Sequence, residues 1–214
     1  MTQFFSEVVF SVIITLSLCI PVHASWLIYH KPEFKGRIID AETKEPIEEA
    51  VVVVEYFTEP LISGPAGGSS SVINVKETLT DKTGEFYFPP YTAFIQPNST
   101  EHNAEFIIYK PGYGNFPNQQ ITPFGLTPVD EQQFFSKGLG SKGELEMWAK
   151  EEKGPQLRMR KVIFGVVEVP RLKTREERLK AIIEPSGHIG SKELPLLYRA
   201  INEERKRYGL GDVH

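Results

Sequence analysis

A run of four valines, residues 51–54, limits the folds open to this chain more than any other feature. Side chains branched at Cβ have few χ1 rotamers and favour extended backbone, so the run predicts a strand. Successive residues of a strand point to opposite faces, so an unbroken apolar run predicts at least partial burial on both faces. We therefore expect residues 49–57 to form an interior strand that is covered from two sides.

Turn residues separate the other apolar segments of the chain. Asp81 and Gly84 predict a tight turn, because aspartate accepts hydrogen bonds from nearby backbone and glycine tolerates positive φ. The segments between such turns predict short strands at residues 34–40, 72–80, 85–88, 104–109 and 161–169. Many short strands joined by turns are typical of a β-sandwich, so a mainly β fold is expected.

Three segments together resemble the carboxypeptidase regulatory-like domain, a transthyretin-like sandwich related to Cna-B modules. The first comprises residues 36–40, 43–47 and 50–52, which follow the pattern G-x-V-x-D, with Ile38 in place of the valine, T-x-x-P-[IL] and A-x-V. The second is residues 80–86, TDKTGEF, which the pattern places in a hairpin between two strands, and the third is residues 107–113, IIYKPGY. The resemblance implies a seven-stranded-type transthyretin-like β-sandwich over residues 33–113, with 161–169 as a closing strand.

In metallocarboxypeptidases this sandwich accompanies a separate zinc domain, so the resemblance implies no peptidase activity. His30 and Glu33 have the His-x-x-Glu spacing of those enzymes' zinc ligands, which keeps a hydrolase as a third hypothesis. The pair lies shortly after the predicted cleavage site, and we expect no catalytic domain around it. Without such a domain, a pair of ligands at this spacing does not form a zinc site. We expect no catalytic residue, no metal and no cofactor.

The first 24 residues predict an export signal. Residues 8–20 are uncharged and apolar, a length typical of a signal h-region and short for a membrane span. Val22 and Ala24 are small residues at the −3 and −1 positions of a cleavage site before Ser25. The segment before residue 8 lacks a basic residue and carries Glu7, so either the true start lies elsewhere or the signal is an unusual one. A retained inner-membrane anchor is the alternative to a periplasmic or secreted protein.

Charge and cysteine content exclude several classes of function. The formal net charge is −4, whereas nucleic-acid binders carry a basic face, so we expect no nucleic-acid partner. Cys19 is the one cysteine, and it lies inside the predicted signal. A chain cleaved after Ala24 would then hold no disulfide and no thiolate site.

Residues 114–160 are rich in Gly, Pro and aromatic residues, and we expect an irregular insertion. Phe134, Phe135 and Trp148 are its candidate ligand-binding residues, because aromatic faces suit sugar rings. The simpler interpretation is that these side chains anchor a long loop onto the sandwich.

Residues 171–214 predict a helical extension. Thr174 and Glu177 have capping-box spacing, which favours a helix to about residue 183. Ser191 is the expected cap of a second helix, and Gly209 the expected Schellman end. The apolar stripe of this helix, which we expect to pack on the sandwich, consists of Leu194, Leu197, Tyr198 and Ile201.

Two non-catalytic functions come before the hydrolase as hypotheses. The first is a non-catalytic, exported structural or protein-interaction module of the bacterial cell envelope. The second is a carbohydrate- or peptidoglycan-binding module that uses the aromatic insertion. The expected partner is accordingly an envelope protein or a glycan, with membrane contact only if the N-terminal segment is retained.

Overall fold

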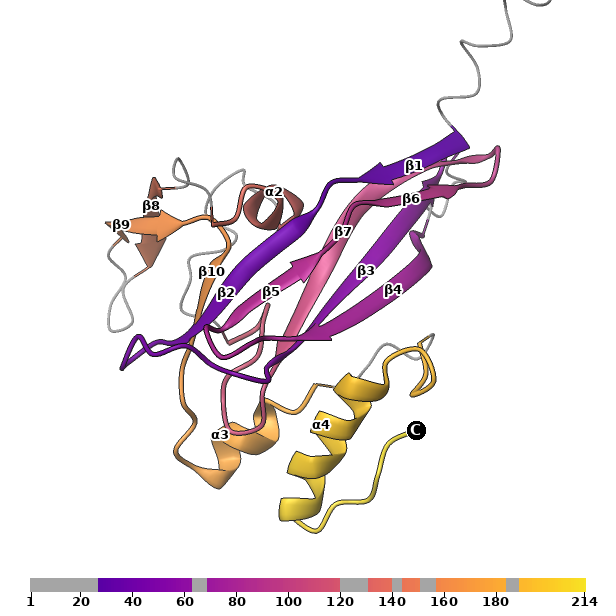
Figure 1. The fold of residues 1–214 in the computed structure, drawn as a ribbon. Coiled ribbons are helices and arrows are strands. Elements are labelled where there is room, and N and C mark those ends of the chain that lie inside the picture. The colour runs from indigo at the N-terminus through magenta and orange to yellow at the C-terminus, as the bar shows by residue number, and fades with distance from the viewer. Residues whose placement is uncertain (1–26, 63–68, 120–130, 140–143, 151–156, 184–188) are drawn as a thin grey trace, which may run out of the picture.

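The structure, a computed structural model, describes residues 27–62, 69–119, 131–139, 144–150, 157–183 and 189–214. It is predominantly β, as predicted, and resembles a sandwich in which two sheets enclose an apolar core (Figure 1). One sheet has the order β10-β2-β5 and consists of Val166–Val169, Phe34–Asp40 and Glu85–Phe88. The other has the order β4-β3-β7 and consists of Ser71–Leu79, Val51–Pro60 and Ser99–Tyr109.

Strand β3 is covered on both faces, which confirms the prediction from its valines. Val52 and Val54 point into the core between the sheets, and Val51 and Val53 point to the outer face of the sheet. The outer face around Val51 and Val53 is covered by helix α4, Pro195–Arg207, so residues 51–54 are buried on both sides of the strand. Figure 1 shows α4 lying below β3 and β4 at the C-terminal end of the chain.

The predicted turn at Asp81 forms, but it does not join a hairpin. Asp81 Oδ1 accepts hydrogen bonds from the amides of Thr83, at 2.8 Å, and Glu85, at 3.0 Å. Gly84 has φ +74°, and a Cβ there would lie 2.5 Å from the carbonyl oxygen of Ile38. Because β4 pairs with β3 and β5 pairs with β2, this turn carries the chain from one sheet to the other.

The region predicted to be an irregular insertion contains regular structure. Helix α2, Glu131–Ser136, is followed by an antiparallel hairpin of β8, Glu144–Lys150, and β9, Leu157–Ile163. The predicted closing strand 161–169 is therefore two strands, β9 and β10, divided near Gly165. Only its second part closes the sandwich, where β10 pairs in parallel with β2.

Two short strands extend the sandwich beyond its predicted start at residue 33. They are β1, Ile28–Lys31, and β6, Tyr91–Phe94, which pair with each other. The Lys31 ammonium is buried and lies 2.6 Å from Glu101 Oε1, which fixes β1 to β7. The pair was not predicted because prolines follow β1 and precede β6.

The C-terminal segment begins with the predicted capped helix. α3, Arg175–Lys180, has a capping box in which the Thr174 side chain accepts from the Glu177 amide and Glu177 accepts from the Thr174 amide. Arg178 of α3 lies 2.8 Å from the buried Glu204 carboxylate of α4, so an ion pair joins the two helices.

α4 starts later than predicted. Ser191 is not its cap, because the helix begins at Pro195 after Leu194. The predicted stripe of Leu194, Leu197, Tyr198 and Ile201 is buried, and the predicted Schellman end is present. In that end the Leu210 amide donates to the Arg205 carbonyl at 3.0 Å, and the Gly209 amide to the Lys206 carbonyl at 3.1 Å.

The predicted signal, residues 1–24, and Cys19 lie outside the described residues. In the part of the chain that is described, no helix is long and apolar enough to cross a membrane.

Candidate functional site

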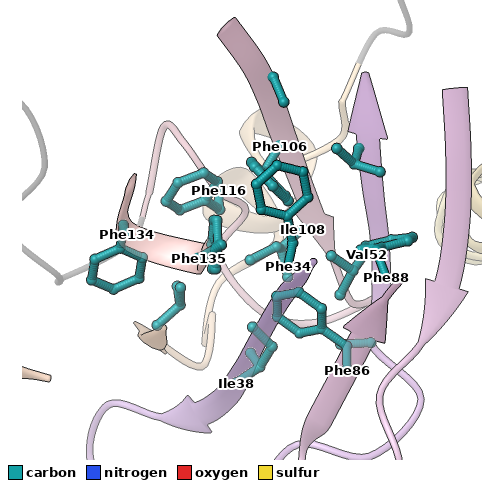
Figure 2. Packing of buried hydrophobic residues seen from close by; sticks show 14 of the residues in the cluster. Phe34, Ile38, Val52, Phe86, Phe88, Phe106, Ile108, Phe116, Phe134 and Phe135 are labelled. Carbon is teal, nitrogen blue, oxygen red and sulfur yellow. The ribbon is translucent and has the colours of Figure 1, made fainter. Parts of the chain in front are cut away.

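Two of the three predicted ligand-binding aromatics lie in the core. Phe134 and Phe135 of α2 are 2% and 0% exposed. The Phe135 ring centroid lies 4.3 Å from that of Phe106 and 5.9 Å from that of Phe116 (Figure 2). The two rings thus anchor α2 against β2 and β7, and they pack among other core residues.

Trp148, the third predicted residue, lies on β8 opposite Met159. Its side chain is outside the described part of the structure. The structure therefore brings Phe134 and Phe135 together in α2 and places Trp148 on a separate hairpin.

His30 and Glu33 take separate partners. The His30 Nδ1 lies 2.9 Å from the Thr92 hydroxyl. Glu33 accepts hydrogen bonds from Lys35 and from the Tyr87 hydroxyl, and these donors hold the pKa of its carboxyl below the usual range. Among the described residues, no three His, Cys, Asp or Glu side chains are grouped so that they could hold a metal ion.

A different site lies on the outer face of sheet β4-β3-β7. α4 covers the half of this face that carries Val51 and Val53. It does not cover the adjacent part of the face, which carries Glu55. The uncovered part is hollowed into a groove of about 800 Å³, which we call the acidic groove. Its acidic lining residues are Glu55 of β3, Glu105 of β7 and Glu193 of the segment before α4.

The point at which α4 begins is set by a residue of β4. The two oxygens of Glu77 accept hydrogen bonds from the amides of Leu196 and Leu197, at 2.6 and 3.0 Å. These are first-turn amides that have no acceptor within the helix, and α4 has no side-chain cap of its own. A carboxylate at this end also interacts favourably with the helix dipole, so Glu77 fixes where the helix starts and where the groove begins.

Glu55 is the central residue of the acidic groove. It is 7% exposed, lines the groove, and has no hydrogen-bond or ion-pair partner among the described residues. Glu105 lies directly opposite it in the β3–β7 register. Burial first, and then the charge of Glu105, raise the pKa of the Glu55 carboxyl. Two adjacent carboxylates, one of them desolvated, form a site that favours a positive charge.

Sequence reasoning missed this site. The sequence feature that could have revealed it is Glu55, which lies inside a strand predicted to be buried on both faces. By strand alternation it points to the same face as Val51 and Val53. A charged residue at a buried strand position is rarely tolerated without a partner or a function. Its neighbour Glu105 is 50 residues further along the chain, so the cluster could not be found from local spacing.

Comparison with protein-family models, curated proteins and solved structures found no match to this chain. The resemblance to the carboxypeptidase regulatory-like domain therefore stays a prediction from its sequence motifs.

Proposed function

We propose that this protein is a non-catalytic protein-interaction module, exported to the bacterial cell envelope. The observation that carries the proposal is the acidic groove, in which a buried carboxylate without a partner lines an open hollow beside strand β4. β4 is an edge strand, since β3 is its only ladder partner in the described sheets. Exposed edge strands are used by many domains to bind extended segments of other proteins.

The N-terminal segment supports the proposed location. Cleavage before Ser25 would release a periplasmic or secreted protein, and a retained segment would tether the domain to the inner membrane. Either location leaves the groove free to meet an envelope protein.

Glycan binding by the aromatic insertion receives less support. Phe134 and Phe135 are buried in the core, so of the three predicted aromatics only Trp148, whose side chain lies outside the described structure, stays a candidate.

The experiment is crosslinking in cells, with the tagged full-length chain purified under denaturing conditions. The N-terminus and cell fraction are determined from the same sample. We expect enrichment of a specific envelope protein, with Ser25 as the new N-terminus. Hydrolysis of a peptide, ester or glycan by the purified chain, abolished by Glu55→Gln, would contradict the non-catalytic assignment. Co-purification of glycan without a protein partner would favour the alternative function.

A further inference from the structure

The chemistry of the acidic groove restricts what it can bind. Three carboxylates line it, from Glu55, Glu105 and Glu193, and the described lining residues include no Lys, Arg or His. Negative charge concentrated in a hollow with low-dielectric walls attracts cations and repels anions. The ligand group that complements this lining is positively charged.

Glu55 is a second observation that points to a ligand. Its side chain is largely buried and has no hydrogen-bond donor among the described residues, which is an unfavourable state for a charged group. Its neighbour Glu105 is acidic as well, so the fold itself does not compensate the charge. A cationic donor in the groove would supply the missing hydrogen bonds and neutralise the pair.

The rest of the lining is apolar. Phe57, Val72, Val75 and Ile189 border the carboxylates. Val75 lies beside Glu55 in the sheet register, on the side opposite Glu105. A lysine or arginine side chain fits such a lining, because its methylene stem packs on apolar surface and its charged end reaches the carboxylates. A small inorganic cation would leave the apolar walls without contact.

The groove is also longer than one side chain. A second hollow of about 490 Å³ adjoins it and shares Ser69, Ser71, Val72 and Ile73 as lining residues. The acidic groove itself follows the first half of edge strand β4, from Ser71 to Val75, and the second hollow continues from the start of β4 toward Phe94 and Gln96. An extended segment laid along this strand would place alternate side chains toward the sheet's outer face.

We infer that the acidic groove binds an extended, basic segment of a partner protein and accepts one of its lysine or arginine side chains between Glu55 and Glu105. This inference rests on the proposed function and names the chemistry of the partner. It assigns the charge recognition to these two glutamates and the surrounding apolar contacts to β4 and Ile189.

The test uses the full chain and two fluorescent decapeptides, one of alternating Lys and Thr and one of alternating Glu and Thr. Binding is followed by fluorescence anisotropy at low and at physiological salt. The variants are Glu55→Gln and Glu105→Gln, with Glu48→Gln as a control that removes an exposed charge in the turn before β3. Glu105 is exposed, so its replacement leaves the core intact. Circular dichroism checks that each variant is folded.

We expect saturable binding of the Lys peptide and none of the Glu peptide. Each groove variant should weaken binding of the Lys peptide about tenfold or more, as the loss of a charge-assisted hydrogen bond does, and Glu48→Gln should change it less than twofold. Equal binding of both peptides, no binding of the Lys peptide, or equal effects of groove and control variants would overturn the inference. So would binding of free spermidine as tight as that of the Lys peptide, which would assign the groove to small polyamines.

The in-cell crosslinking experiment distinguishes failure of the basic-segment inference from failure of the proposed function. If crosslinking in cells captures a protein partner and Glu105→Gln leaves that crosslink unchanged, the interaction module stands and the groove is not its binding surface. If no protein partner is captured, the proposed function fails, whatever the peptides do.

Discussion

The contact between Glu77 and the start of α4 gives a quantitative prediction. Glu77→Ala removes both acceptors of the Leu196 and Leu197 amides and leaves these groups partly buried without partners. Loss of a helix cap costs about 1 kcal/mol, the second unpaired amide adds about 1 kcal/mol, and the lost charge near the helix dipole adds about 0.3–1 kcal/mol. We therefore expect Glu77→Ala to lower the free energy of unfolding by about 2–3 kcal/mol.

Glu77→Gln is the matched variant, because it keeps the shape of the side chain and one carbonyl acceptor. It should cost about 1 kcal/mol, since one hydrogen bond and the charge are lost. Glu48→Ala, at an exposed position, should change stability by less than about 0.5 kcal/mol.

Urea unfolding followed by circular dichroism measures these differences. Hydrogen exchange supplies a local readout, because the Leu196 and Leu197 amides should lose protection while amides of the β3–β7 ladder keep it. A cost below about 0.5 kcal/mol for Glu77→Ala, or equal costs for the alanine and glutamine variants, would refute the reasoning.

Three further changes have definite expected outcomes. Phe135→Ala should destabilise the fold by about 3–5 kcal/mol in urea unfolding, whereas Phe94→Ala, at a residue 88% exposed, should cost less than about 0.5 kcal/mol. Gly84→Ala should lower the free energy of unfolding by at least about 1–2 kcal/mol, because φ is positive there and the added Cβ meets the Ile38 carbonyl. Gly211→Ala is the control, since nothing lies near that position, and an equal cost of the two changes would contradict this reasoning. Glu55→Leu should raise stability at neutral pH by about 1–3 kcal/mol. The raised pKa of Glu55 means that the folded state binds this proton more tightly, so the difference from wild type should shrink as pH falls; a difference that grows on acidification would show that burial of Glu55 is not the cause.

The features that the sequence predicted correctly depend on residues close together in the chain. The valines of β3, the Asp81 turn, the Thr174 capping box and the Schellman end at Gly209 each need only a few neighbouring residues. In these cases backbone preference and local hydrogen bonding agree with the tertiary fold.

The features that were missed or wrong depend on distant residues. The cap of α4 was assigned to Ser191, but Glu77, which lies more than 100 residues earlier, provides it. The turn after β4 was expected to join a hairpin, because its local residues do not reveal that β4 and β5 belong to different sheets. Phe134 and Phe135 were candidates for exposed ligand contacts, and only the packing of α2 on the sandwich buries them.

Part of the candidate site was accessible from sequence. A glutamate within a strand expected to be buried on both faces marks Glu55 as unusual. Its pairing with Glu105 and the end of the α4 cover follow from strand register and helix docking, which a single sequence does not specify.

α4 is synthesised long after the strands that it covers, so their outer face stays exposed during much of synthesis. A nascent chain that has not yet produced residues 189–201 can pair β3 with β4 and β7, but it leaves Val51, Val53 and Tyr109 facing water. Such a continuous apolar strip is what chaperones bind and what drives aggregation. A chain truncated before α4 should therefore bind chaperones. Docking of α4 covers the apolar strip and ends the period in which the nascent chain is prone to aggregate.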